Sequence, residues 1–128
     1  MTKDLILQLI SFIDLTTLDS RDTKDKVLEL VTKANQGVEG VHPAAICVYP
    51  TFAETVASGT TLPIAVVAGC FPTGQTFIQA KTEEIKLAAA SHASEIDMVI
   101  NRGKLIEGDK AYLRKEIRAC KKAADKKL

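Results

Sequence analysis

Residues 64–70 read IAVVAGC, an apolar run without polar alternation that ends in a glycine and a cysteine. Three comparable runs occur elsewhere, FIDLTTL at 12–18, AAICVY at 44–49 and EIDMVIN at 95–101. Strands that are covered on both faces have nearly continuous apolar sequences, and such strands are typical of parallel sheets. The four runs therefore predict four parallel strands.

Helical periodicity lies on both sides of the first predicted strand. Leucine and isoleucine recur at helical spacing within residues 5–10, which predicts a short N-terminal helix. After the strand, Asp22 or Thr23 is expected to cap a second helix that closes at Gly37 and Gly40. The apolar stripe of this helix consists of Val27, Leu30, Val31 and Ala34.

The later strands are also separated by helical signals. The sequence TFAE at 51–54 has the pattern of a capping box and predicts a short helix that ends at residues 58–59. Asp109 is expected to cap the last helix. The apolar stripes of the two longer helices are Ile78, Ile85, Ala89 and His92, and Leu113, Ile117, Cys120 and Ala124.

Strands that alternate with helices predict right-handed βαβ crossovers and an α/β fold. We expect a single domain over residues 1–128, a parallel (βα)4 unit preceded by the short N-terminal helix. A complete eightfold barrel needs about 250 residues, so four units correspond to half of a TIM barrel. The alternative is an open flavodoxin- or Rossmann-like sheet with helices on both faces.

The charges nearly cancel, since 17 basic and 16 acidic residues give a net charge of +1. This balance argues against a nucleic-acid partner, which needs a basic excess, and against a polybasic membrane-binding surface. The apolar segment near the N-terminus is too short to span a bilayer and does not have the pattern of a signal peptide. Every lysine falls in a predicted helix, turn or terminus, so all are expected on solvated faces.

The numbers and spacing of the cysteines and histidines indicate the redox compartment of the protein and whether it has a metal site. Three cysteines form no CxxC pair, and their odd number favours a reducing, cytoplasmic compartment. Two histidines cannot form a histidine-based metal cluster, and no spacing resembles a zinc site. We therefore expect no metal site.

Two aspartates interrupt the predicted strands, Asp97 in the fourth run and Asp14 in the first. Burial of a carboxylate is costly unless it is paired, and no lysine lies in any predicted strand. The carboxyl ends of parallel strands form the working face of such folds. We therefore predict that Asp97 transfers protons and that Asp14 points into a substrate pocket. The alternatives are a hydrogen bond from Asp14 to a neighbouring turn and a buried lysine partner for Asp97.

Two cysteines and an aromatic turn lie near the same predicted face. Free cysteine is usually a small buried hydrophobe, so neither Cys47 nor Cys70 is expected to act as a nucleophile. Cys47 can still line a pocket. The turn FPTG at 71–74 either contributes the ring of Phe71 to that pocket or is simply a strand-to-helix turn that needs glycine and proline.

Four blocks of the sequence together resemble the deoxyribose-phosphate aldolase family. They are IDLTTL at 13–18, AAICVYP at 44–50, FPTG at 71–74 and EIDMV at 95–99, and their order and spacing match that family. The resemblance covers essentially the whole chain. It implies a class I aldolase on a TIM barrel, which cleaves 2-deoxyribose 5-phosphate to glyceraldehyde 3-phosphate and acetaldehyde without a metal or organic cofactor.

The resemblance also implies roles for individual residues. Asp97 matches the acid that exchanges protons with water, and Asp14 matches an acid that supports this chemistry in the pocket. Cys47 matches a thiol near the substrate. The matching pocket-lining residues are Thr16, Leu18 and Phe71.

The family's Schiff-base lysine lies on the sixth strand, its partner lysine on the seventh, and its phosphate site on later loops. Because none of the four predicted strands holds a lysine, we expect no turnover from this chain alone. An open half-barrel exposes two sheet edges and an apolar inner face, which predicts a homodimer. The competing hypothesis is a flavodoxin-like or receiver-like binding module. A receiver needs an aspartate after the third strand, where this chain has Gly69 and Cys70.

Overall fold

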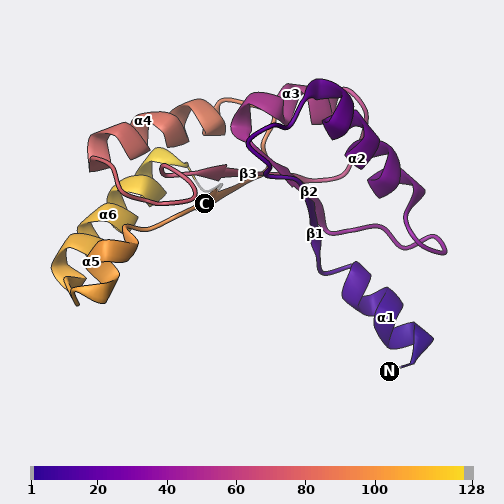
Figure 1. Cartoon of the computed structure of the whole chain (residues 1–128), viewed down its shortest axis with the longest axis horizontal. Coiled ribbons are helices and arrows are strands. Elements are labelled where there is room, and N and C mark those ends of the chain that lie inside the picture. Colours follow the sequence, from indigo (N-terminus) through magenta and orange to yellow (C-terminus); the bar gives the residue numbers. More distant parts are fainter. Residues whose placement is uncertain (1, 126–128) are drawn as a thin grey trace.

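The computed structural model describes residues 2–125, in which four strands alternate with helices (Figure 1). The strands are β1 (Asp14–Thr16), β2 (Ala45–Val48), β3 (Ile64–Ala68) and β4 (Glu95–Met98). The helices are α1 (Lys3–Ile10), α2 (Lys24–Gln36), α3 (Ala53–Ala57), α4 (Ile78–Ala89), α5 (Arg102–Ile106) and α6 (Lys110–Ala123), and a 3₁₀ helix η1 (Pro50–Phe52) precedes α3.

The strands are all parallel and lie in the sequential order β1-β2-β3-β4. Sequential right-handed crossovers place every connecting helix on the same face of a sheet. Side chains from α2, α3, α4 and α6 accordingly form one core with Ile46, Val66 and Ile96 of the strands, and α2, α3 and α4 lie above the sheet in Figure 1. The predicted parallel (βα)4 fold is confirmed. The alternative of an open sheet with helices on both faces is wrong.

The opposite face of the sheet, called here the inner face, is not packed against the long helices of residues 2–125, and only the short helix α5 reaches its rim. A second, smaller cluster lies there, formed by small and medium side chains of the two central strands. Its buried members are Ala45, Cys47, Ala65 and Val67, with Leu18, Tyr49 and Phe71 packed against them. This face corresponds to the interior of a closed barrel.

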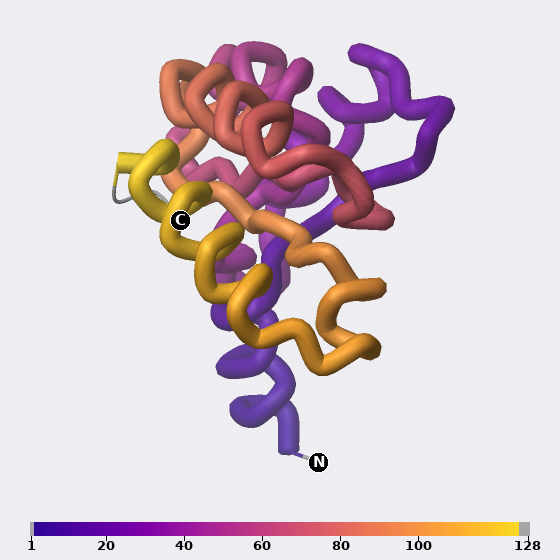
Figure 2. The backbone as a smooth tube through the Cα atoms, turned by 90° about the vertical axis from the view of Figure 1, so that its left-hand side faces the viewer, coloured from indigo at the N-terminus to yellow at the C-terminus, as the bar shows by residue number. Residues whose placement is uncertain are grey.

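Helix α1 forms where the leucine and isoleucine periodicity predicts it, but it projects away from the sheet (Figure 2). No residue of α1 is buried, and Leu5, Ile6 and Leu9 are 41–47% exposed. Among the described helices, none combines the length and apolar character that a crossing of a lipid bilayer requires.

Two of the predicted helix caps are confirmed and one is wrong. Thr23 caps α2 and Asp109 caps α6, each accepting a hydrogen bond from the backbone N–H three residues ahead. The TFAE sequence does not form a capping box. η1 begins at Pro50, and α3 begins only at Ala53. The N-cap residue of α3 is Phe52, whose side chain makes no capping hydrogen bond.

Several predicted boundaries move because loop contacts replace strand or helix pairing. β1 ends at Thr16, where Thr17 turns its hydroxyl to the Asp22 carboxylate. β4 ends at Met98, and of the last three residues of the fourth run only Val99 still donates a hydrogen bond to the neighbouring strand, to the Ala68 carbonyl oxygen. His92, expected on the apolar stripe of α4, lies beyond that helix and is exposed.

The most informative correction concerns a buried ion pair. Lys81 of α4 and Glu116 of α6 are both 0% exposed, and Lys81 Nζ lies 2.8 Å from Glu116 Oε1. The prediction that all lysines are solvated is therefore wrong at Lys81. Ile117, expected on the buried face of α6, is 42% exposed, because Glu116 takes the inward position instead.

Candidate active site

The parallel register brings the predicted acids and the thiol to the inner face. Thr16 is aligned with Cys47 across β1 and β2, and Val67 is aligned with Asp97 across β3 and β4. Side chains alternate between the two faces of a strand, so Asp14 lies on the same face as Thr16. A pocket of 580 Å³ opens on this face, and it is lined by Asp14, Thr16, Leu18, Cys47, Val67, Phe71, Asp97, Met98, Val99, Ile100, Arg102 and Leu105. All six residues predicted for the site therefore line one pocket.

Asp97 and Asp14 lie on the inner face, on the two edge strands of the sheet, and neither is buried. Both are exposed, contrary to the expectation of a buried carboxylate, because the elements of residues 2–125 cover this face only in part. Partial removal from water raises the pKa of Asp97, and the negative charge of Asp14 raises it further. A carboxyl group with a raised pKa holds a proton more readily than an ordinary aspartate, which favours a role in general acid–base catalysis.

Cys47 faces these acids from β2. It is only 3% exposed, and its Sγ lies 4.0 Å from Asp97 Oδ2, which can accept a weak hydrogen bond from the thiol. Burial, and then the charges of Asp97 and Asp14, raise the pKa of Cys47 to about 11. The thiol is therefore protonated at neutral pH, which suits a pocket-lining residue and not a nucleophile.

The pocket rim is ordered by contacts between the ends of β1, β2 and β3. The Tyr49 hydroxyl donates to the Leu18 carbonyl oxygen at 3.2 Å. The rings of Tyr49 and Phe71 meet edge to face, with centroids 6.2 Å apart and an interplanar angle of 70°. Tyr49 was not singled out from the sequence, although its position at the carboxyl end of the second run gives the signal.

The loop after β3 needs unusual backbone conformations. Gly69, Cys70 and Gly74 have positive φ angles of 81°, 62° and 69°, and the Phe71–Pro72 peptide bond is cis. The Glu84 carboxylate accepts the backbone N–H groups of Gly69 and Cys70 at 3.0 and 2.8 Å. This anchor fixes the loop that carries Phe71 to the pocket.

The pocket also has contributors that sequence reasoning missed. Arg102 and Leu105 of α5 line it, and Arg102 is the only cationic residue among the described lining residues. The charge of Glu95, at the start of β4, reaches Cys47. The sequence shows α5 only as the stretch between Asn101 and Gly108, and five residues are too few for a reliable helical pattern.

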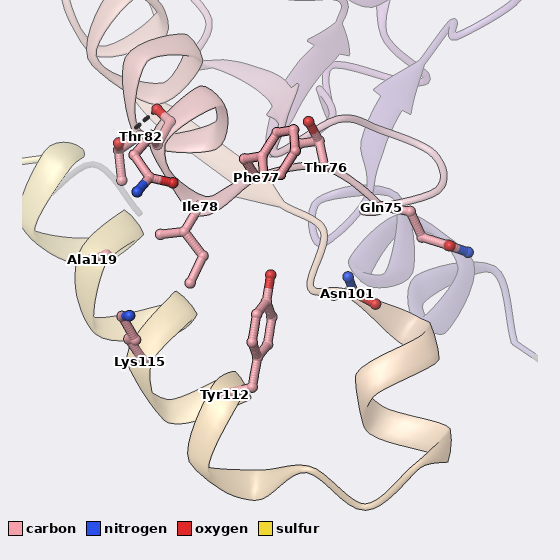
Figure 3. A pocket seen from close by; sticks show the side chains of 10 residues that line it. Gln75, Thr76, Phe77, Ile78, Thr82, Asn101, Tyr112, Lys115 and Ala119 are labelled. Carbon is pink, nitrogen blue, oxygen red and sulfur yellow. Dashed lines mark hydrogen bonds between the residues drawn. The ribbon is translucent and has the colours of Figure 1, made fainter.

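A larger cavity of 810 Å³ lies on the helical side, between α4 and α6 (Figure 3). Tyr112 and Lys115 rise from α6 toward the segment that contains Thr76 and Phe77. Its described lining includes no carboxylate and no thiol, so it does not contain the predicted chemistry. No cluster of His, Cys, Asp and Glu side chains suited to a metal ion occurs within residues 2–125.

Comparisons with known proteins identify the family of the chain. Residues 8–128 match the DeoC/LacD family aldolases. A deoxyribose-phosphate aldolase of Homo sapiens is 39% identical over 135 residues, which cover 92% of this chain and 42% of the human protein. One from Treponema denticola is 34% identical over 124 residues, covering 94% and 55%. The chain thus spans about half the length of the curated relatives it matches.

Solved structures show the same fold. The crystal structure of a putative deoxyribose-phosphate aldolase from Coccidioides immitis superposes with a TM-score of 0.83 at 29% identity, covering 94% of this chain and 47% of that one. A tetrameric deoxyribose phosphate aldolase from Aeropyrum pernix superposes with a TM-score of 0.68 at 22% identity, covering 97% and 57%. With a family match over nearly all its length, the chain belongs to the DeoC/LacD family aldolases.

Proposed function

We propose that this chain supplies the proton-transfer side of a class I aldolase active site that acts on 2-deoxyribose 5-phosphate. The observation that carries the proposal is the meeting of Asp97, Asp14 and Cys47 in one pocket, with the pKa of Asp97 raised. The family match and the names of the relatives support the substrate class.

In a retro-aldol step, a base takes the proton from the substrate hydroxyl, and the carbon–carbon bond breaks as electrons flow into an iminium formed with a lysine amine. We assign the proton transfer to Asp97, through a water molecule, and the electrostatic support of its raised pKa to Asp14. Cys47, Thr16, Leu18 and Phe71 shape the pocket. No lysine is among its described lining residues, so the amine has to come from elsewhere.

We also propose a domain organisation, an activity and an oligomeric state for the isolated chain. Residues 1–128 form one (βα)4 domain of an aldolase barrel, without turnover in isolation. The domain associates as a homodimer through its inner face or its open strand edges. A cytoplasmic setting fits its three free cysteines.

A chimeric barrel tests the proposal. In the chimera, this chain replaces the matching segment of the human relative. The remaining segment of the human protein is expected to supply the Schiff-base lysine, which the family resemblance places on the sixth strand. We expect cleavage of 2-deoxyribose 5-phosphate, and Asp97→Asn should lower kcat by roughly 10²- to 10⁴-fold, as loss of a general acid–base group does. Glu29→Gln, which alters an exposed carboxylate of α2, is the matched control. A folded chimera without turnover, or one whose kcat is unaffected by Asp97→Asn, contradicts the proposal.

A further inference from the structure

Two fully buried side chains of opposite charge lie behind the sheet, outside the inner-face pocket. Lys81 and Glu116 join α4 to α6, with both side chains 0% exposed and their charged atoms 2.8 Å apart. Replacing such a pair by apolar residues often stabilises a protein, so stability alone is a weak reason for its presence. Its hydrogen bonds point to a different role.

The pair holds the segment that follows β4. Lys81 Nζ donates to the Val99 carbonyl oxygen at 2.9 Å. Glu116 Oε2 accepts the backbone N–H of Asn101, also at 2.9 Å. The last sheet hydrogen bond of this strand runs from the Val99 N–H to the Ala68 carbonyl oxygen. The side chains of Lys81 and Glu116 therefore hydrogen-bond the backbone directly after the point where the sheet pairing ends.

The segment held in this way is a wall of the pocket. Val99 and Ile100 line the pocket directly between Asp97 and Arg102. On the helical side, Asn101 lines the second cavity (Figure 3). Residues 99–101 therefore contribute to both spaces. The position of this segment decides how the end of β4 presents Asp97 to the inner face.

Helix α4 anchors the neighbouring loop in the same manner. Glu84 lies three residues after Lys81, close to it on the helix surface. It accepts the N–H groups of Gly69 and Cys70 at the end of β3. One helix thus fixes two consecutive loops of the pocket through charged side chains.

We infer that Lys81 and Glu116 are positioning residues, which hold residues 99–101 so that the Asp97 carboxylate stays directed at Cys47 and Asp14. The functional meaning of this inference rests on the proton-transfer role proposed for Asp97. The geometry can be tested without turnover, in the 128-residue chain itself. Failure of the chimera therefore leaves the outcome of this test intact, and the reverse also holds.

Two neutral substitutions at one position give the sharpest test. Glu116→Gln and Glu116→Leu both remove the charge beside Lys81, but only Gln keeps an acceptor for the Asn101 N–H. In Glu116→Leu we expect the Asn101 amide to exchange roughly ten- to a hundredfold faster than in Glu116→Gln. We also expect the pKa of Asp97, followed by carboxyl ¹³C NMR, to fall toward its ordinary value only in Glu116→Leu. Equal exchange rates and equal Asp97 pKa values in the two variants overturn the inference.

A charge-swapped double variant covers the case in which Glu116→Leu does not fold. Lys81→Glu with Glu116→Lys keeps the attraction between α4 and α6 but sets acceptor against acceptor at Val99 and donor against donor at Asn101. We expect it to lose Asn101 protection as Glu116→Leu does. If it retains the protection and the Asp97 pKa of the unsubstituted chain, the pair only joins two helices and the inference is wrong.

The control is Lys86→Met, which removes an exposed ion pair with Glu83 on the same helix. It should change neither readout, since Lys86 makes no contact with residues 99–101 in the described hydrogen bonds and ion pairs. The other charged or titratable groups that line the Asp97 pocket are Asp14 of β1, Cys47 of β2 and Arg102 of α5, and all variants leave them unchanged.

Discussion

At the scale of single residues, the site depends on carboxylates placed where neither water nor a cation fully compensates their charge. Asp97 is the clearest case, since partial burial and the nearby charge of Asp14 both raise its pKa. A group held in this way favours the neutral form in the folded state. The folded chain therefore carries an electrostatic cost at neutral pH that a functional role for Asp97 would explain.

This cost gives a prediction for stability against pH. The raised pKa of Asp97 means that the folded state binds its proton at a higher pH than the unfolded chain does. Above the folded-state pKa both states are ionised and the folded one is penalised, so Asp97→Asn should raise the free energy of unfolding there. As pH falls through the raised pKa, the native carboxyl becomes neutral and the advantage of the variant shrinks. It should be lost below the ordinary aspartate pKa of about 4.

Urea unfolding of both proteins from pH 7 down to pH 3 measures this difference. Glu29→Gln is the control, as it alters an exposed carboxylate on α2, away from the inner-face pocket. A variant that is less stable than the parent at pH 7, or an advantage that grows toward acid pH, contradicts the account of the Asp97 environment.

At the scale of elements, close approach between loops decides the shape of the pocket. Gly74, at the end of the loop after β3, has a φ of 69°, and a Cβ there would overlap the carbonyl oxygen of Ile100. The loops after β3 and β4 are thus in direct backbone contact. Only glycine permits both the conformation and the approach.

Gly74→Ala should therefore destabilise the chain by about 3 kcal/mol or more, since steric overlap adds to the strain of a positive φ. Gly108→Ala is the matched control, because Gly108 has a φ of 74° but no atom within 4 Å of an added Cβ. Strain alone should cost it about 1 kcal/mol. Denaturant unfolding compares the two, and equal losses of stability contradict the described contact between the loops.

The sequence predicts the order and kind of the main elements because the apolar runs and stripes are strong local signals. It predicts that Asp14, Cys47 and Asp97 gather where the parallel strands end, and in the structure the three line one pocket. It misses the Lys81–Glu116 pair, although Lys81 falls on the buried stripe with Ile85 and Ala88. A lysine is almost never fully buried unless it is paired, so the residue type favours a solvated Lys81 despite its position on the stripe. The partner, Glu116, is 35 residues away in the chain and therefore lies outside any local pattern.

Local sequence patterns also cannot predict that the inner face is left open. Whether Asp97 is buried depends on what covers the pocket, and that is a property of the assembled sheet and not of the fourth run. The expectation of a buried carboxylate came from the apolar neighbours of Asp97. Ile96 faces the helices, but Asp97 faces the inner side, where Met98, Val99 and Ile100 also line the pocket.

At the scale of the whole molecule, an uncovered inner face and two free strand edges favour self-association. Further apolar side chains are exposed near the β1 edge, where Phe12 is 70% and Ile13 47% exposed. We predict a homodimer, with twice the 13.8 kDa of one chain, in static light scattering at micromolar concentration. A mass of one chain across that concentration range contradicts the prediction.

The pocket contains Asp14 and Asp97 but no lysine among its described lining residues, so we expect this chain to have no amine that captures the aldehyde. Borohydride trapping of the purified chain with acetaldehyde, read by peptide mass spectrometry, tests it most directly, with the chimeric barrel as positive control. We expect only slow, scattered labelling of exposed lysines in this chain and, in the chimera, a single modified lysine in the segment supplied by the human relative. A specific adduct on one lysine of this chain, at one per molecule, would contradict it.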